Sequence, residues 1–431
     1  MLKLRGQRGD EMEYNCKVYV VDMIMGSGKS SAAINFMNEF HQVYKFLYVT
    51  PFLSEIERVK TMCPKLKFAD PQTKMGHGKL TDIKFLLSHG RNIATTHVLF
   101  SMFTAELIDI CRSQGYILIM DEVANVVTQY NIGEEDKAAL LERYAYVEEE
   151  TGLVRWREEK NNYKDSKYQL EKRLCELQAL AMYGNKDILM WLLPIGCFNA
   201  FEEVYILTYL FEGQLQRYYY DFFKLPYEYL YVKGDSLAEY EFTTVPQQQK
   251  IKYDYKQLIH ICDIDKLNSI GEFEYDLSKS WFKRNEGNKV VLPRLQKNIY
   301  NYFRNVTKTS ANKNIWTTFK DYKDKLSGKG YSRGFLPCNS RATNAYKDRT
   351  CVAYCLNKYI NSMVKMFFTS KGVCTDEDTY ALSEMLQFIW RSAIREGKDI
   401  WVYIPSKRMR NLLIKWIENN PVCKGEIKCC L

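Results

Sequence analysis

The stretch from Gly26 to Ser30 reads GSGKS, a pattern that suits the binding of phosphate groups. Glycine allows the tight backbone path in which successive N–H groups close around phosphate oxygens. Lys29 is then expected to reach the terminal phosphates of a nucleotide, and Ser30 is expected to hold Mg²⁺ through its hydroxyl. The predicted nucleotide-binding residues are Gly26, Ser27, Gly28, Lys29, Ser30 and Ser31.

A magnesium site also needs a carboxylate, and the stretch ILIMDEVA supplies two. Its four apolar residues predict a buried strand, with Asp121 and Glu122 at the carboxyl end. We expect Asp121 to bind Mg²⁺ together with Ser30, and Glu122 to orient or deprotonate an attacking water. A solvated strand end is the plain alternative for two adjacent acids, but the GSGKS loop on another strand favours the metal site.

Gln387, Arg391 and Arg395 follow one another at steps of four residues in QFIWRSAIR. On a single helix they would form one stripe, with neighbouring turns roughly 6 Å apart. Arginine stays charged, binds phosphate oxygens in pairs and can stabilise the charge of a phosphoryl-transfer transition state. We predict that this stripe acts on the nucleotide from across a cleft; a solvent-exposed basic helix face is the alternative.

Such a site needs a scaffold that brings distant segments to one edge. Short apolar runs such as CKVYVVDM and YKFLYVTP alternate with amphipathic stretches over the first 130 residues, and the same rhythm returns near residue 314. This alternation predicts α/β domains with parallel sheets, whose ligands lie beyond the carboxyl ends of the strands. We expect a first domain over 1–225, with an α+β insertion over about 132–194, and a second domain over 226–431.

Composition narrows the class of protein. The 431 residues are 46% hydrophobic and 26% charged, as in a globular protein of two or three domains. The net charge of +9 fits a partner with a phosphate backbone, and it fits a lysine-rich surface equally well. Thirteen scattered cysteines without a CxxC pair indicate reduced thiols rather than zinc or disulfides. With neither a secretory-type leader nor an apolar run of about 20 residues, we expect a cytoplasmic protein without a membrane partner.

The order of these motifs resembles that of the superfamily 2 helicases and translocases of DEAD/DEAH type. MGSGKS resembles motif I and DEVA motif II, while YVTPFLSEIERV, ATTHVLF, ILTYLF, SRATNAYKDR and QFIWRSAIR resemble motifs Ia, Ib, III, V and VI. ILTYLF and QFIWRSAIR together also resemble helicase-like proteins of bacteriophages. The resemblance implies two RecA-like domains in tandem, ATP and Mg²⁺ as cofactors, and ATP hydrolysis that drives movement on nucleic acid. It favours DNA over RNA, a role in replication, recombination or repair, and proteins of those processes as partners.

A nucleic-acid groove would lie along strand ends of both domains, where hydroxyls and backbone N–H groups contact phosphates. The predicted contacts are Thr50, Pro51, Thr95, Thr96 and His97 in the first domain and Thr317, Thr318, Asn339, Arg341 and Thr343 in the second. The resemblance also implies that Thr208 couples this groove to the ATP site. Basic and aromatic residues interleave in WFKRNEGNK and RLQKNIYNYFRN, which suits either base stacking or an ordinary surface.

The sequence departs from the family pattern in several places. Met23 replaces a glycine of the usual loop, and the two arginines of QFIWRSAIR are four residues apart instead of three, so either could be the arginine finger. SRATNAYKDR lacks the usual glycine and aspartate, and no adenine-reading Q motif is recognisable. Two other functions compete: a non-catalytic nucleic-acid-binding protein with a vestigial core, and a terminase-like packaging ATPase. The complete phosphate-loop and acid residues argue against the first, and the glutamine–arginine stripe argues against the second.

Overall fold

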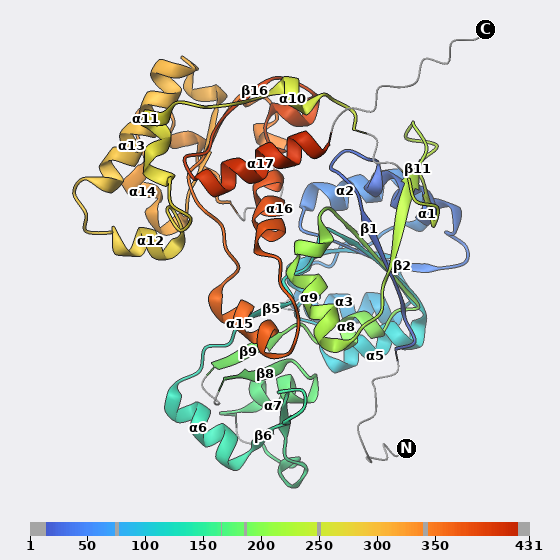
Figure 1. Ribbon diagram of the computed structural model, residues 1–431. Coiled ribbons are helices and arrows are strands. Elements are labelled where there is room, and N and C mark those ends of the chain that lie inside the picture. The colour runs from blue at the N-terminus through green and yellow to red at the C-terminus, as the bar shows by residue number, and fades with distance from the viewer. Residues whose placement is uncertain are drawn as a thin grey trace.

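The computed structural model describes residues 14–73, 77–164, 166–184, 188–247, 251–338 and 344–420. Two α/β domains lie side by side, and a smaller α+β unit extends from the first of them (Figure 1). This is the expected fold class, with two parallel-sheet domains in tandem and an insertion in the first. In the described part of the chain, no helix is long and apolar enough to cross a bilayer.

The first domain is built on a seven-stranded sheet, parallel except for one edge strand. In spatial order its strands are β12 (Glu241–Thr243), β11 (Glu228–Lys233), β1 (Lys17–Asp22), β10 (Glu203–Thr208), β4 (Tyr116–Asp121), β2 (Lys45–Thr50) and β3 (Ile93–Thr96). Helices cover both faces, so β4 is buried along its whole length. On one face lie α1 (Lys29–Glu39) and α2 (Leu53–Met62), and on the other lie α3 (Lys79–Ser88), α4 (His97–Phe100), α5 (Ala105–Gln114), α8 (Gly196–Asn199) and α9 (Leu215–Phe223).

The first sheet extends further along the chain than the expected boundary at 225/226. Strand β11 pairs with β1, and β12 pairs with β11 as an antiparallel edge. Leu230 and Val232 of β11 are buried in the core under α1. These two strands therefore belong to the first sheet, because their apolar side chains complete the layer that α1 covers.

The insertion forms its own small core between β4 and β10. A three-stranded sheet joins β5 (Val127–Gln129), β9 (Ile188–Leu192) and β8 (Leu180–Tyr183), and β6 (Ala145–Val147) and β7 (Val154–Trp156) form an antiparallel hairpin. Helices α6 (Glu134–Arg143) and α7 (Gln169–Glu176) flank them. Tyr144 stacks on Trp156 at 5.7 Å between ring centroids, at the centre of an aromatic cluster.

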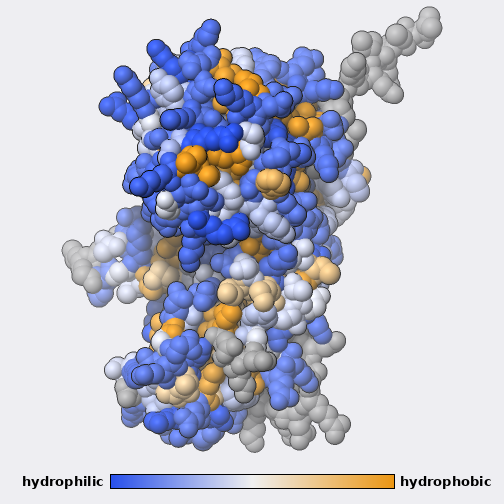
Figure 2. Space-filling view, turned by 60° about the vertical axis from the view of Figure 1, so that its left-hand side comes forward, coloured by the Kyte–Doolittle hydropathy of each residue, from blue (hydrophilic) through white to orange (hydrophobic). Residues whose placement is uncertain are grey.

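The second domain is a four-stranded parallel sheet in the order β13 (Ile259–Ile261), β16 (Ile400–Tyr403), β15 (Cys351–Tyr354) and β14 (Asn314–Thr317). One face packs against α10 (Tyr255–Leu258), α16 (Glu377–Ile389) and α17 (Lys407–Asn419). The other packs against the helical lobe, formed by α11 (Asp265–Asn268), α12 (Lys279–Arg284), α13 (Val291–Asn301), the π-helical turn Tyr302–Val306 and α14 (Lys323–Leu326). Figure 2 turns the lobe towards the viewer at the top, where hydrophilic residues predominate.

One segment of the second domain crosses onto the first. Helix α15 (Ser362–Ser370) lies next to α9 and the insertion, away from its own sheet (Figure 1). Its Phe367 and Phe368 are fully buried in the first domain's core, with ring centroids 5.1 Å from Phe222 and 5.9 Å from Tyr218 respectively. The two domains are therefore joined by an apolar contact as well as by the connecting chain.

Candidate functional site

The GSGKS loop has the backbone that a phosphate cradle requires. Gly26 and Gly28 adopt φ angles of 85° and 87°, which L side chains rarely adopt, and α1 begins directly after Gly28. The Lys29 ammonium donates to the carbonyl oxygen of Met23 at 2.5 Å. The Met23 side chain turns into the core, where its sulfur accepts a hydrogen bond from Val232 N at 3.1 Å. Methionine at this position therefore leaves the cradle open.

The hydroxyl of Ser30 and the carboxylate of Asp121 meet at the end of β1 and β4, with Oγ donating to Oδ1 at 3.2 Å. Asp121 is 8% exposed, and burial raises its pKa to about 7, helped by the negative charges of Glu122 and Glu55. Such a concentration of buried negative charge suits a divalent cation. In the described part of the chain no three His, Cys, Asp or Glu side chains cluster for a metal, so a cation here would take its other oxygens from phosphate and water, as Mg²⁺ commonly does.

A cleft of about 1420 Å³ separates this loop from the second domain and is lined by both. From the first domain it is lined by Gly26, Gly28, Lys29, Ser30, Ser31, Asp121 and Glu122, and from the second by Gln387, Arg391 and Arg395. Gln387 Nε2 donates to Glu122 Oε2 at 3.4 Å across the cleft. The hydroxyl of Ser27, by contrast, is buried. The tertiary structure thus brings together all the predicted catalytic residues, which are separated by up to 366 positions in the chain.

The predicted single-helix stripe is wrong in its geometry. Helix α16 ends at Ile389, two residues before Arg391. Ser392 is extended, at φ −83° and ψ −173°, and Arg395 lies in a separate 3₁₀ turn, Ala393–Glu396. The helical ladder breaks after Trp390, because the N–H groups of Arg391 and Ser392 bond to carbonyls only three residues back. The N–H of Ala393 then bonds to the carbonyl of Arg349 at 2.8 Å. The two arginines still reach the cleft, but from a turn.

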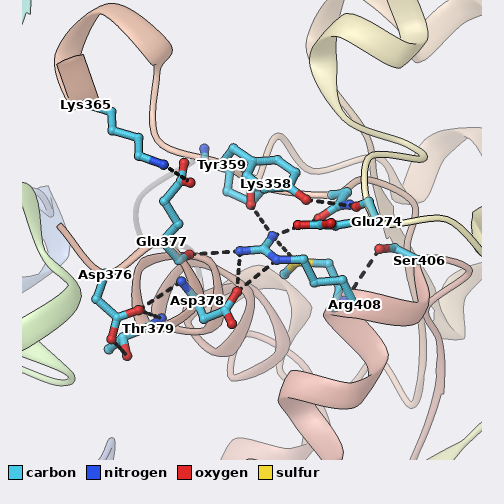
Figure 3. Close-up of polar contacts among 12 residues, drawn as sticks. Glu274, Lys358, Tyr359, Lys365, Asp376, Glu377, Asp378, Thr379, Ser406 and Arg408 are labelled. Carbon is cyan, nitrogen blue, oxygen red and sulfur yellow. Dashed lines mark hydrogen bonds and ion pairs between the residues drawn. The ribbon is translucent and has the colours of Figure 1, made fainter.

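The start of α16, the helix that carries Gln387, is held by Arg408 of α17 (Figure 3). The guanidinium donates to Asp378 Oδ1 at 2.9 Å, to the Glu377 carbonyl at 3.1 Å and to the Lys358 carbonyl at 2.8 Å. It also lies 4.2 Å from the ring centroid of Tyr359. Arg408 thereby fixes the first turn of α16 to the segment that follows β15.

The segment after β10 links the phosphate loop to the second domain. The carbonyl of Thr208 accepts from Met23 N at 3.1 Å, and the side chain of Thr208 is fully buried. The Asp22 carboxylate accepts the N–H groups of the two residues after Tyr209, at 2.7 and 2.9 Å. Tyr209 in turn accepts a hydrogen bond from Trp416 Nε1 of α17 at 2.8 Å. A continuous chain of contacts therefore runs from the strand before the loop to the second domain.

Most of the predicted nucleic-acid contacts that the structure describes are buried, which corrects the expectation of an open groove along these strand ends. Thr50, Thr95, Thr317 and Thr318 are at most 2% exposed. Thr96 caps α4, and His97 donates from Nε2 to the backbone carbonyl of Asp121 at 3.0 Å. These hydroxyls and this imidazole complete turns at the ends of the strands, while Pro51, Thr96 and His97 border the same cleft as the phosphate loop. Asn339, Arg341 and Thr343 lie outside the described residues.

Several cleft residues escaped the sequence reasoning, among them Glu55, Arg58, Lys358, Glu384 and Tyr240. Arg58 donates to the Ser31 hydroxyl at 3.2 Å and pairs with Glu55 at 3.0 Å. Burial opposes the charge on Lys358, but its ion pair with Glu384 at 3.0 Å raises the Lys358 pKa well above its usual value. The position of Glu384 at the cleft could have been predicted from the sequence, because it lies one helical turn before Gln387. The remaining residue is Tyr240 of the β11–β12 hairpin, whose ring covers Gly28; nothing in the surrounding sequence indicates this position.

Comparison with known proteins gives two family matches and one full-length relative. Residues 253–417 match the YonV C-terminal Rossmann-like domain, and residues 127–191 match the YonV middle domain. The SPbeta prophage-derived uncharacterized protein YonV of Bacillus subtilis (strain 168) is 40% identical over 412 residues, which cover 94% of this chain and 99% of the relative.

Among solved structures, Xpd4 of S. tokodaii is similar at 12% identity and a TM-score of 0.48, covering 93% of this chain and 94% of that one. A hypothetical ATP-dependent RNA helicase from Sulfolobus tokodaii is similar at 10% identity and a TM-score of 0.26, with 90% and 87% covered. The DUF1998 helicase MrfA bound to DNA is similar at 10% identity and a TM-score of 0.34, with 94% of this chain and 49% of that one covered.

Proposed function

This chain belongs to the YonV family, and we propose that it is a nucleic-acid-stimulated ATP hydrolase, a helicase or translocase of superfamily 2 type. One observation carries the proposal: a single cleft contains the phosphate loop and acid pair of one α/β domain and Gln387, Arg391 and Arg395 of the other. A chain that only bound nucleic acid would have no use for this combination. The prophage origin of the relative supports a phage-encoded protein. A role in DNA replication, recombination or repair, with DNA favoured over RNA, is part of the proposal and follows from the resemblance of the motifs to those of helicases.

Each side chain at the cleft has a defined task in this proposal. Lys29, whose pKa is lowered by burial, would exchange its bond to the Met23 carbonyl for the terminal phosphates of ATP. Ser30 and Asp121 would hold Mg²⁺, which supplies positive charge to the transferred phosphoryl group. Glu122, oriented by the amide of Gln387, would accept a proton from the attacking water.

The two arginines would complete the site from the second domain. Arg391 and Arg395 both line the cleft, so either can bring a guanidinium to the negative charge that develops during phosphoryl transfer. Because they come from the other domain, hydrolysis depends on how the two domains are placed. The contacts through Thr208, Tyr209 and Trp416 would carry that dependence from the phosphate loop to the second domain, which is the coupling that movement along a strand requires.

Phosphate release is the experiment that tests this function. Wild-type protein is assayed alone and with single-stranded, double-stranded and forked DNA and with single-stranded RNA. Lys29→Ala is expected to lose the activity, because the charge that binds the phosphates is gone. Lys65→Ala, which replaces an exposed lysine that does not line the cleft, is expected to keep it. Unchanged nucleic-acid-stimulated hydrolysis in Lys29→Ala would falsify the assignment. No hydrolysis by wild-type protein with any of the four nucleic acids would favour the non-catalytic alternative.

A further inference from the structure

A positively charged surface on the helical lobe lies outside the nucleotide cleft. Between residues 279 and 308 the chain has eight lysines and arginines and a single glutamate. All eight basic side chains are exposed, and we call them the basic face: Lys279, Lys283, Arg284, Lys289, Arg294, Lys297, Arg304 and Lys308. The stretch 256–337 is described without a gap, and none of its residues lines the cleft. The nucleotide site therefore does not account for this charge.

Neighbouring acids do not neutralise the basic face. The one glutamate of the stretch, Glu286, pairs at 2.7 Å with Lys325, a residue outside it. Arg294 donates to the hydroxyl of Ser269 at 2.7 Å, which leaves its charge uncompensated. Over the ranges that the structure describes, none of the eight basic residues forms an ion pair. The excess charge thus faces solvent and is free to attract a polyanion.

Helix α13 places part of this charge in a row with an aromatic ring. Lys297, Tyr300 and Arg304 follow at steps of three and four residues, so they share one side of the helix as it passes into the π-helical turn. Tyr300 is 40% exposed. On the opposite side, Leu295 and Ile299 are fully buried against the second sheet. The apolar side of α13 is therefore already covered by the second sheet, and its exposed side is cationic and aromatic. A helix that inserts into a membrane surface needs an exposed apolar side, so this exposed side suits a nucleic acid better.

We propose that the basic face is a nucleic-acid-binding surface, separate from the nucleotide cleft. Lys283, Lys297 and Arg304 would contact backbone phosphates, and the ring of Tyr300 would stack on a base. Contacts of this kind bind a strand without reading its sequence. In Figure 2 the lobe that carries the basic face forms the top of the molecule and is open to solvent. The inference rests on the proposed function only in the choice of nucleic acid as the polyanion.

The test is binding of a fluorescein-labelled single strand of thirty deoxythymidines, measured by anisotropy over a salt series without nucleotide. The variant Lys283→Gln/Lys297→Gln/Arg304→Gln removes three exposed charges of the basic face. Each lost phosphate contact lowers the slope of log affinity against log salt by about 0.7, so we expect a slope smaller by about 2 and an affinity lower by about 10- to 100-fold near 0.1 M salt. The matched control Lys17→Gln/Lys65→Gln/Arg91→Gln removes the same charge from exposed positions of the first domain and is expected to bind as wild type does.

Three outcomes overturn the proposal. Equal losses in the triple variant and its control would show that total charge, and not the basic face, governs binding. Loss of binding to vesicles of phosphatidylserine and phosphatidylcholine, with binding to the single strand unchanged, would assign the surface to a membrane instead. Phosphate release without nucleic acid is expected to be the same in wild type and triple variant. If wild-type protein hydrolyses no ATP but the triple variant binds the single strand more weakly, the proposed ATP hydrolase is refuted and the binding surface stands. If wild-type protein hydrolyses ATP and the triple variant binds the single strand as wild type does, the binding surface is refuted and the proposed ATP hydrolase stands.

Discussion

The most specific prediction concerns Asp121. The burial of its carboxylate, which is proposed to bind Mg²⁺, also lowers the free energy of unfolding when no cation is bound. Burial raises the pKa of Asp121 from its usual 3.8 to about 7. A carboxyl with a raised pKa in the folded state binds its proton more tightly there than in the unfolded chain, so its contribution to stability is present below about pH 4 and is lost as the pH rises through 7. At about 1.4 kcal/mol for each unit, the full loss is about 4 kcal/mol, of which about 3 kcal/mol falls between pH 5 and pH 8.

The substitution Asp121→Asn removes this titration and keeps the shape of the side chain. We expect the variant to lose ATP hydrolysis but to gain stability relative to wild type as the pH rises, by about 3 kcal/mol more at pH 8 than at pH 5. Urea unfolding of the ligand-free proteins, followed by tryptophan fluorescence and by circular dichroism, measures the difference when the two probes give the same midpoint. Asp265→Asn, which removes an exposed carboxyl of the second domain, is the matched control.

The difference in unfolding free energy between wild type and Asp121→Asn isolates the titration of Asp121, because the other titratable groups are the same in both proteins. A difference in stability that is the same at both pH values would refute the reasoning, as would an Asp121→Asn protein less stable than wild type at pH 8. Mg²⁺ with nucleotide at pH 8 is expected to stabilise wild type and to leave Asp121→Asn nearly unchanged, since the cation would offset the buried negative charge only where that charge exists.

Three further substitutions test other parts of the site. Gly28→Ala should abolish binding of a fluorescent ATP analogue, because a Cβ there would lie 2.6 Å from the ring of Tyr240 at a φ of 87°; if the variant binds as wild type does, the cradle is not where nucleotide binds. Gln387→Ala should lower kcat about 10- to 100-fold with little change in KM for ATP, because it removes the amide that orients Glu122; a change in KM alone would contradict that role. Arg408→Lys should lower the free energy of unfolding by about 2–4 kcal/mol, since one ammonium cannot replace the several directed bonds of the guanidinium, and a loss below about 0.5 kcal/mol would contradict this.

The parts of the site that depend on local pattern could be predicted from the sequence. The apolar run before GSGKS forms β1, the loop follows it, and α1 begins at Lys29 as the spacing indicates. Asp121 ends a buried strand, and in a parallel sheet strand ends meet at one edge, so its proximity to Ser30 followed from fold class alone. The loop, the strand and the helix start are each set within about ten residues of chain, where glycine conformation and hydrophobic periodicity decide the outcome.

Non-local contacts decided the features that were missed. Tyr240 reaches the loop only because β11 pairs with β1, a contact between segments about 200 residues apart. The predicted stripe assumed one uninterrupted helix, but the helix ends at Ile389, and Ala393 in the following turn bonds to distant Arg349. Thr50 and Thr317 have the residue types of phosphate contacts, yet their burial depends on the segments packed around the strand ends.

The sequence by itself determined the chemical groups at the cleft and the class of sheet that carries them, because the glycine, lysine, serine and acid positions of the proposed phosphate and metal site lie next to apolar strands in the chain. Tertiary structure alone decided that Gln387 meets Glu122, that Arg408 holds the helix carrying Gln387, and that the basic face of the lobe lies outside the cleft. The physical reason is that these relations join groups far apart in the chain, and only the packing of the two domains fixes the distances between them.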